Sequence, residues 1–367
     1  MPAAADDGFD ADGALDEGHW TARGPASLQA WARAGARFGA LPTLSRGDHI
    51  DPALALPGMT ARKSLQLHAF IDVASPAIAA SRVSHVVDWC AGKGHLGREL
   101  ARRTGLPLLS LELQPALCAD ARRLAGAAGV DATVVCGDAL GDGAEVLMRT
   151  PGAATGFTVA LHACGDLHGA LIARFEGAAL ALAPCCYTRA VDSGRARLLS
   201  MRARDVAARV GLVIDDRDLR LIHEQVSETG TREIGDVRRR QAHRLGFDAW
   251  RRSLGAASYT PVPAIPLSAT RLGFVDFGER LADAAGLPRP DSSFAEFEGE
   301  GWRRLDAVTR RDLVRSLFRA PLEAFLVTDR ACALDERGYE VSVGTFCSRA
   351  VTPRNRLILA RSRHQRS

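Results

Sequence analysis

One stretch decides the fold of this 367-residue chain: Val86-Val87-Asp88-Trp89-Cys90-Ala91-Gly92-Lys93-Gly94-His95-Leu96. It runs from a short apolar segment through a Gly-rich turn into a helical pattern. Glycines suit such a turn because the backbone can bend tightly and approach a ligand without a Cβ in the way. The stretch therefore predicts a strand, a ligand-binding loop and a helix, in that order.

Strand-like and helical patterns alternate around this stretch. Helical patterns occupy residues 96–103 and 115–128, and short apolar runs occupy 83–89, 107–113, 132–136, 157–161 and 178–183. This alternation is typical of a parallel sheet with helices on both faces. The predicted fold class is α/β.

The segments that flank this core have other patterns. Apolar residues at helical spacing predict helices at 27–38 and 60–73, and Arg-rich helices at 196–210, 234–254 and 302–319, with a Pro-rich connector at 259–266. Two apolar runs, 340–346 and 356–360, predict a final hairpin that closes the sheet. We therefore divide the chain into an acidic tail predicted to be disordered (1–25), helices and a ligand-binding α/β core (26–190), a helical Arg-rich insertion (191–330) and C-terminal strands (331–367).

Composition limits the class of protein. With 47% hydrophobic and 25% charged residues the chain has a globular composition, and no apolar run reaches the roughly 20 residues of a membrane span. The N-terminal residues lack the apolar stretch of a secretory signal and the Arg-rich pattern of a transit peptide, so we expect a cytoplasmic protein. In that compartment we expect the eight cysteines to be reduced.

Acidic residues follow three of the predicted strands. Glu112 lies twenty residues after Gly92 and is placed to accept hydrogen bonds from both hydroxyls of a ribose. Asp138 is placed to accept from an adenine amino group, or to cap the following turn. The glycines also fit the pattern G-x-G-x-x-G, so NAD is one interpretation, but Asp88 at the first strand tip is more typical of a methyltransferase.

The fourth and fifth strands also end in reactive residues. The fourth ends in Leu161-His162-Ala163-Cys164-Gly165-Asp166 and the fifth in Pro184-Cys185-Cys186-Tyr187. Ligands of open α/β sheets gather beyond the carboxyl ends of the strands, so we expect His162 and Asp166 to face a ligand. Asp166 could equally cap a helix.

Several cysteines lie near these strand ends. They are Cys90, Cys136, Cys164, Cys185 and Cys186. Thiolates and His162 could converge on a metal ion, but because the chain has no C-x-x-C pair, we expect these thiols to pack under a ligand and expect no metal site.

Three motifs together resemble those of a class I methyltransferase family that uses S-adenosylmethionine. They are residues 88–97, 161–166 and 184–187, at the ends of the first, fourth and fifth predicted strands. This family includes methyltransferase-like protein 25 and the methyltransferase domain of the glutathione S-transferase C-terminal domain-containing protein. The resemblance covers roughly residues 59–190 and 315–362, including Thr328-Asp329-Arg330. It implies a Rossmann-like sheet of seven strands with the last one antiparallel. Cys90 replaces the first Gly of the family pattern D-x-G-x-G-x-G. This departure affects the expected geometry of the loop but not the expected cofactor.

The resemblance also implies roles for individual residues, with S-adenosylmethionine as the cofactor. We expect the cofactor to contact Asp88, Cys90, Gly92, Lys93, Gly94, Glu112, Asp138 and His162. The catalytic residues on the acceptor side are expected to be His162, Asp166 and Tyr187. Lys63 and Lys93 could meet a carboxylate or phosphate as point charges.

The basic insertion indicates RNA as the acceptor. Its arginines form clusters that suit phosphate groups, at 238–244 and 303–311. A protein or a small molecule is the alternative acceptor. An NAD-linked oxidoreductase and a non-catalytic binding module are alternatives of other classes. No membrane partner is expected, and the oligomeric state stays open.

Overall fold

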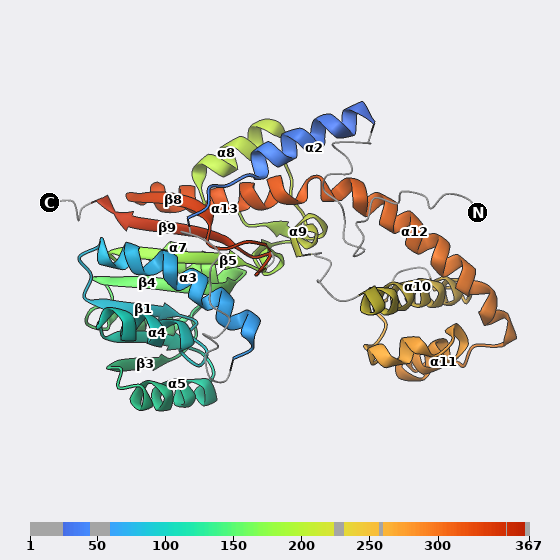
Figure 1. The fold of residues 1–367 in the computed structure, drawn as a ribbon. Helices are drawn as coiled ribbons and strands as arrows, with labels where there is room; N and C mark the ends of the chain where they lie inside the picture. Colours follow the sequence, from blue (N-terminus) through green and yellow to red (C-terminus); the bar gives the residue numbers. More distant parts are fainter. Residues whose placement is uncertain (1–24, 45–58, 224–230, 257–259, 350, 364–367) are drawn as a thin grey trace. The chain divides into compact units, whose positions relative to one another are not determined.

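The computed structural model describes residues 25–44, 59–223, 231–256, 260–349 and 351–363. The predicted acidic tail lies almost wholly outside these residues. The chain forms two compact units, drawn in Figure 1: an α/β unit built from residues 38–224 and 320–367, and a helical unit that comprises 225–319 and the residues up to Arg37. None of the described helices is long and apolar enough to cross a membrane.

The α/β unit contains a seven-stranded sheet in the order β3-β2-β1-β4-β5-β9-β8. The strands are β1 (His85–Trp89), β2 (Leu108–Glu112), β3 (Ala132–Cys136), β4 (Gly156–Cys164), β5 (Ala179–Cys185), β8 (Tyr339–Thr345) and β9 (Arg356–Ser362). Strands β1 to β5 are parallel, and β9 runs antiparallel to both β5 and β8. This confirms the α/β class, the seven strands and the antiparallel last strand.

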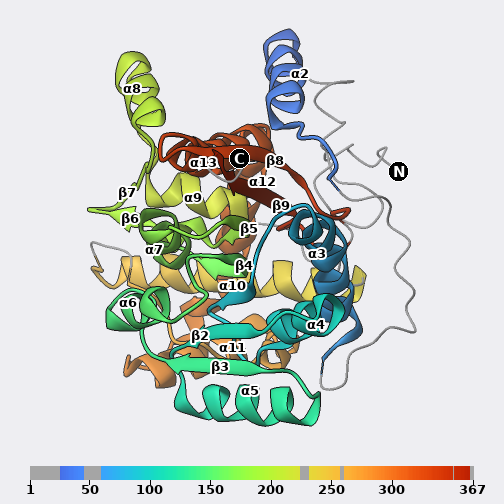
Figure 2. The same ribbon diagram turned by 90° about the vertical axis from the view of Figure 1, so that its left-hand side faces the viewer.

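Helices cover both faces of the sheet, as Figure 2 shows. They are α3 (Ala61–Ala79), α4 (His95–Thr104), α5 (Pro115–Ala127), α6 (Asp142–Arg149), α7 (Asp166–Arg174) and α13 (Arg319–Asp335). The same unit also contains α8 (Met201–Val210) and α9 (Asp216–His223), and α9 packs on α13. On one face Phe70 and Leu100, from α3 and α4, pack against Phe157. On the other face Leu147, Leu171 and Val327, from α6, α7 and α13, form a second buried cluster. The sheet is thus shielded on both sides, and its strand ends stay available to a ligand.

The chain after β5 differs in detail from the prediction. Residues 195–196 form β7 (Arg195–Ala196), which pairs with β6 (Val191–Asp192), and α8 begins only at Met201 because the Ser200 hydroxyl caps it by accepting from the Ala203 N–H. Residues 191–224 and 320–330 belong to the α/β unit, whereas we had placed them in the insertion.

A buried ion pair helps to hold these segments in the α/β unit. The Asp329 carboxylate on α13 accepts the backbone N–H groups of Leu199 and Ser200 and lies 2.7 Å from Nη1 of Arg330. The Arg330 Nε–H donates to Nε2 of His168, whose Nδ1–H donates to the Ala163 carbonyl. This network joins α13 to α8 and to the end of β4.

The helical unit has its own small core. It contains most of α2 (Ala26–Gly39), together with α10 (Thr231–Ser253), α11 (Phe274–Ala285) and α12 (Phe297–Ser316). The rings of Phe274 and Phe294 stack with centroids 4.4 Å apart, and Phe247 packs against them. A Cβ on Gly301 would lie 2.3 Å from the Ala242 carbonyl oxygen, so this glycine permits close packing of α12 on α10. The helices predicted at 27–38, 234–254 and 302–319 are confirmed.

Candidate functional site

The Gly-rich loop joins β1 to α4 at the carboxyl edge of the sheet. Gly92 and Gly94 have left-handed φ values of +58° and +68°, which L-residues with a Cβ adopt at a cost. A Cβ on Gly92 would meet nothing within 4 Å, whereas a Cβ on Gly97 would lie 2.6 Å from Leu108. Gly97 is therefore required for packing, and Gly92 borders open space.

Asp88 fixes the start of α4 from the end of β1. Its Oδ2 accepts the Gly97 N–H at 2.9 Å, and the residue is only 3% exposed. Burial raises the pKa of Asp88 to about 7, although the Gly97 hydrogen bond opposes this shift. The side chain thus holds the loop in place from beneath.

Glu112, at the end of β2, braces the same loop. Its Oε2 accepts the Gly92 N–H at 2.9 Å and its Oε1 accepts the Gln114 N–H at 3.0 Å. A carboxylate can accept about four hydrogen bonds, so these two leave acceptor capacity. Glu112 therefore holds the loop through two backbone contacts and retains capacity to accept further hydrogen bonds.

Two other residues that we expected to contact the cofactor, Asp138 and Cys90, directly follow or lie just beyond the ends of β3 and β1. Asp138 follows β3, is exposed, and accepts the Leu140 N–H at 2.9 Å, which realises the turn-capping alternative without covering the carboxylate. Cys90 has a φ of +59°, and burial, together with Glu112 and Asp88, raises its pKa to about 12. Its thiol therefore stays protonated at neutral pH.

The two lysines singled out in the sequence are exposed. Lys93 pairs with Asp120 across 3.2 Å. The Lys63 backbone N–H donates to the side chain of Thr60, which caps α3. Neither ammonium group is buried, so a ligand can reach both from solvent.

His162 lies in a bulge of β4, between the two paired segments of the strand. Its φ is +64°, and its Nε2 lies 3.0 Å from the amide oxygen of Gln66. Since the Gln66 amide nitrogen donates to the Val351 carbonyl, the oxygen faces His162 and Nε2 carries the proton. Burial, helped by Arg354, lowers the pKa of His162 to about 4, so the ring is neutral at pH 7.

The other two residues expected on the acceptor side have different surroundings. Asp166 starts α7, is half-buried, and pairs with Arg197 across 3.4 Å. Tyr187 is 2% exposed, and its ring packs edge-on against His168 with the Arg330 guanidinium over its face. Asp166 remains accessible to a ligand, whereas the Tyr187 side chain lies in the interior.

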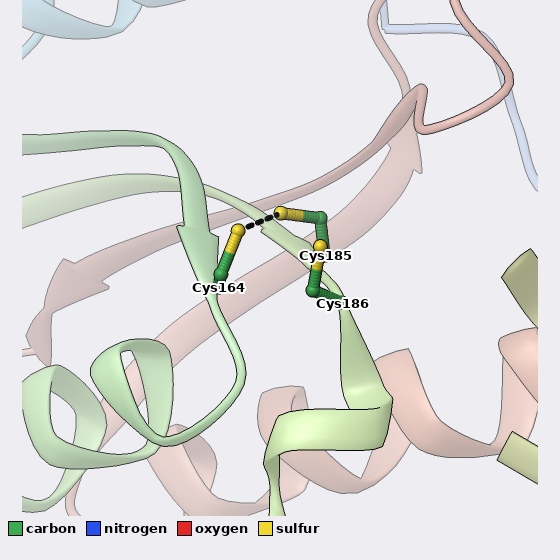
Figure 3. Close-up of side chains that lie close together, drawn as sticks. All are labelled: Cys164, Cys185 and Cys186. Atoms are coloured by element: carbon green, nitrogen blue, oxygen red, sulfur yellow. Dashed lines mark hydrogen bonds between the residues drawn. The ribbon is translucent and has the colours of Figure 1, made fainter. Parts of the chain in front are cut away.

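Three thiols converge beside these strand ends (Figure 3): Cys164 from β4, and Cys185 and Cys186 from the end of β5. The sulfur atoms of Cys164 and Cys185 are 3.2 Å apart. The hydrogen bond from Cys185 lowers the pKa of Cys164 to about 6 and raises that of Cys185. The sequence placed these cysteines near the strand ends, but it did not show that these three converge, because Cys164 and Cys185 come from adjacent strands and are 21 residues apart in the chain.

Residues 62–192 match the family Methyltransf_32, described as a methyltransferase domain. No curated protein sequence matches the chain, so the likeness to the two relatives named above remains a resemblance.

Solved structures are similar at low identity. The cyclopropane synthase MmaA2 from Mycobacterium tuberculosis is 14% identical, with 71% of this chain and 84% of that chain covered and a TM-score of 0.28. Geranyl diphosphate C-methyltransferase from Streptomyces coelicolor A3(2) is 12% identical, with 76% and 95% covered and a TM-score of 0.23. The PH0793 protein of Pyrococcus horikoshii is 15% identical with a TM-score of 0.26, and the match covers 38% of this chain and about half, 49%, of that one.

The matched segment runs from α3 to β6 and contains all of the predicted site residues. Together with the strand order, which is that of a Rossmann-like methyltransferase sheet, this match supports an enzyme that transfers a methyl group from S-adenosylmethionine. It favours this interpretation over an NAD-linked oxidoreductase.

Proposed function

We propose that S-adenosylmethionine binds at the ends of β1 and β2, and that its methyl group is transferred to an acceptor that approaches beside β4. The observation that carries the proposal is the open space over Gly92, which is bordered by the Glu112 carboxylate. A ribose can donate both hydroxyls to Glu112 there, and Gly92 has no Cβ to obstruct the methionine part. The family match supports this placement.

Other side chains complete the cofactor site in this proposal. Asp88 acts through the loop, since its carboxylate is buried against the Gly97 N–H. The exposed Asp138 carboxylate accepts the adenine amino group, and Lys93 offers a point charge at the solvent side. We assign Cys90, Gly94 and His162 to the same cofactor site.

The bound cofactor supplies an electrophilic methyl group. The residues of this chain have to hold the acceptor atom in line with it and exclude water, because positioning alone can account for much of the barrier reduction. His162 and Asp166 lie where β4 ends and α7 begins, and we assign them to the acceptor side. Tyr187 acts as a positioning residue, since its buried ring supports the end of β5.

For the acceptor we propose RNA. Arg310 and Arg311 of α12 are exposed, and the sequence has a formal net charge of +4. Other arginines of the predicted clusters already pair with acids: Arg239 with Asp236, and Arg304 with Asp248. The basic face proposed for phosphate contacts is therefore smaller than the arginine count indicates.

Two measurements test these proposals. Isothermal titration should show binding of S-adenosylmethionine and none of NADH, and binding of NADH alone would refute the cofactor site. Purified protein should then be incubated with radiolabelled cofactor and a lysate treated with nuclease or with protease. Loss of the labelled product after nuclease alone supports RNA, and loss after protease alone indicates a protein acceptor.

A further inference from the structure

The cysteine cluster is built by strand register. Cys164 and Cys185 are paired residues on the adjacent parallel strands β4 and β5, so their side chains leave the sheet on the same face. Their sulfur atoms are 3.2 Å apart. Two thiols from distant parts of the sequence are thus held side by side by the sheet itself.

The third thiol joins them through an unusual backbone conformation. Consecutive residues of a strand point to opposite faces, so Cys185 and Cys186 would normally diverge. Cys186 instead adopts φ 50° and ψ 50°, the left-handed region, at a cost of roughly 1–2 kcal/mol for a residue with a Cβ. As a result the sulfur atoms of all three cysteines lie within 4.8 Å of one another.

Strain of this kind is concentrated at these strand ends. Among the described residues other than glycine, positive φ occurs at Cys90, His162, Cys186 and Ser193. Of these four, all but Ser193 lie at the ends of β1, β4 and β5. Strained residues cluster at functional sites, because the surrounding structure has to compensate for their cost.

The donor set suits a thiophilic cation. In a tetrahedral zinc site with Zn–S bonds of about 2.3 Å, the sulfur atoms lie roughly 3.8 Å apart. The Cys164–Cys185 separation of 3.2 Å is shorter than this value, and all three sulfur atoms lie within 4.8 Å of one another, so the first two would have to move apart by about 0.6 Å to bind the ion. Cys164 and Cys186 are half-buried, which leaves a route for the ion, and the guanidinium groups of Arg189 and Arg354 act electrostatically on Cys164.

We propose that Cys164, Cys185 and Cys186 form a binding site for a thiophilic divalent cation, with Zn²⁺ as the best fit. On binding, the protons that the three thiols still carry are released to solvent as the sulfur–metal bonds form. Three protein ligands leave the fourth position to water or to a ligand that enters the adjacent site. From the sequence we had expected no metal site, because no C-x-x-C pair is present.

The test is titration of the reduced, metal-free protein with Co²⁺, followed by Zn²⁺. We expect one equivalent of Co²⁺ to produce thiolate-to-cobalt charge-transfer absorption, which Zn²⁺ then abolishes. The variants Cys164→Ser and Cys186→Ser should each weaken Co²⁺ binding by at least roughly tenfold. Cys332→Ser, which changes a half-buried thiol on α13, is the matched control and should bind Co²⁺ like the wild type.

Three outcomes would overturn the proposal, and two of them need only the wild-type protein. Absence of charge-transfer absorption in the wild type would do so. So would equal Co²⁺ affinity of the wild type and the folded variants. A Cys164–Cys185 disulfide, detected by mass spectrometry after purification without added oxidant, would show that the two thiols pair with each other instead of with a metal. Since the readout involves no S-adenosylmethionine, its outcome is independent of the proposed methyl transfer.

Discussion

Replacement of Gly92 by alanine, compared with the same replacement at Gly105, distinguishes the loss of a ligand contact from the effect of backbone strain. The φ of Gly92 is +58°, and a Cβ there meets no atom within 4 Å. Gly105, which caps the other end of α4, has a φ of +70° and equally open surroundings. The variants Gly92→Ala and Gly105→Ala therefore impose similar strain on opposite sides of α4, whose 10 residues span about 15 Å.

The two variants should differ only in cofactor affinity. Each alanine in a left-handed conformation costs about 1 kcal/mol of folding free energy, so both proteins should unfold at similar urea concentrations. The methyl group at position 92 extends into the space proposed for the cofactor, where even a modest displacement of ligand or loop matters. We expect Gly92→Ala to weaken S-adenosylmethionine binding at least tenfold, or by about 1.4 kcal/mol.

Isothermal titration of both variants, combined with urea unfolding, provides the comparison. Gly105→Ala should bind the cofactor with wild-type affinity. If folded Gly92→Ala binds as tightly as Gly105→Ala, the cofactor does not occupy the space over Gly92, and the site assignment is wrong. If both lose affinity equally, the loss reflects a disturbed α4 and not a ligand contact.

Three further predictions follow from the buried charges. Glu112→Gln should weaken cofactor binding by about 1–3 kcal/mol, because a charged acceptor becomes neutral, and a deoxyribose analogue should bind wild type and variant alike. Since burial raises the pKa of Asp88 from 3.8 to about 7, the folded state binds this proton more tightly, and the free energy of unfolding should fall as pH rises between these values. Urea unfolding of Asp88→Asn should lack this decline, with a difference on the order of 4 kcal/mol across the window, and parallel pH profiles would contradict the assignment. Arg330→Met should cost about 3–5 kcal/mol because the Asp329 carboxylate is fully buried. The exposed control Arg149→Met should cost less than about 1 kcal/mol, and equal losses would show that burial does not matter here.

The sequence predicted the sheet because its strands are short, apolar and bounded by turns. Burial on both faces demands such continuous apolar runs, and every residue of β2 and β5 is buried. The short helices α6 and α9 were not predicted from the sequence. Each has 8 residues, or about two turns, which is too short to establish a helical spacing of apolar residues. The contacts that join residues 199–200 to α13 could not be predicted, because the partners of Asp329 lie 130 residues earlier in the chain.

The site could be predicted in position but not in detail. Acids at the tips of consecutive strands meet at one sheet edge, so Asp88 and Glu112 could be placed from spacing alone. That each of them accepts a loop N–H, from Gly97 and Gly92, depends on the path of the loop. The cysteine cluster depends on a register match and on the φ of Cys186, and neither leaves a mark in residue spacing.

The pairing of β5 with β9 has a consequence for the folding of the protein during its synthesis on the ribosome. Strand β5 ends at Cys185, but its antiparallel neighbour begins only at Arg356. At roughly 5–20 residues per second, translation of the intervening stretch of about 170 residues takes on the order of ten to thirty seconds. During that time a wholly apolar strand has an unpaired edge, which is a template for intermolecular pairing. Synthesis of this chain should therefore depend on chaperones that shield the nascent sheet until its last strands emerge.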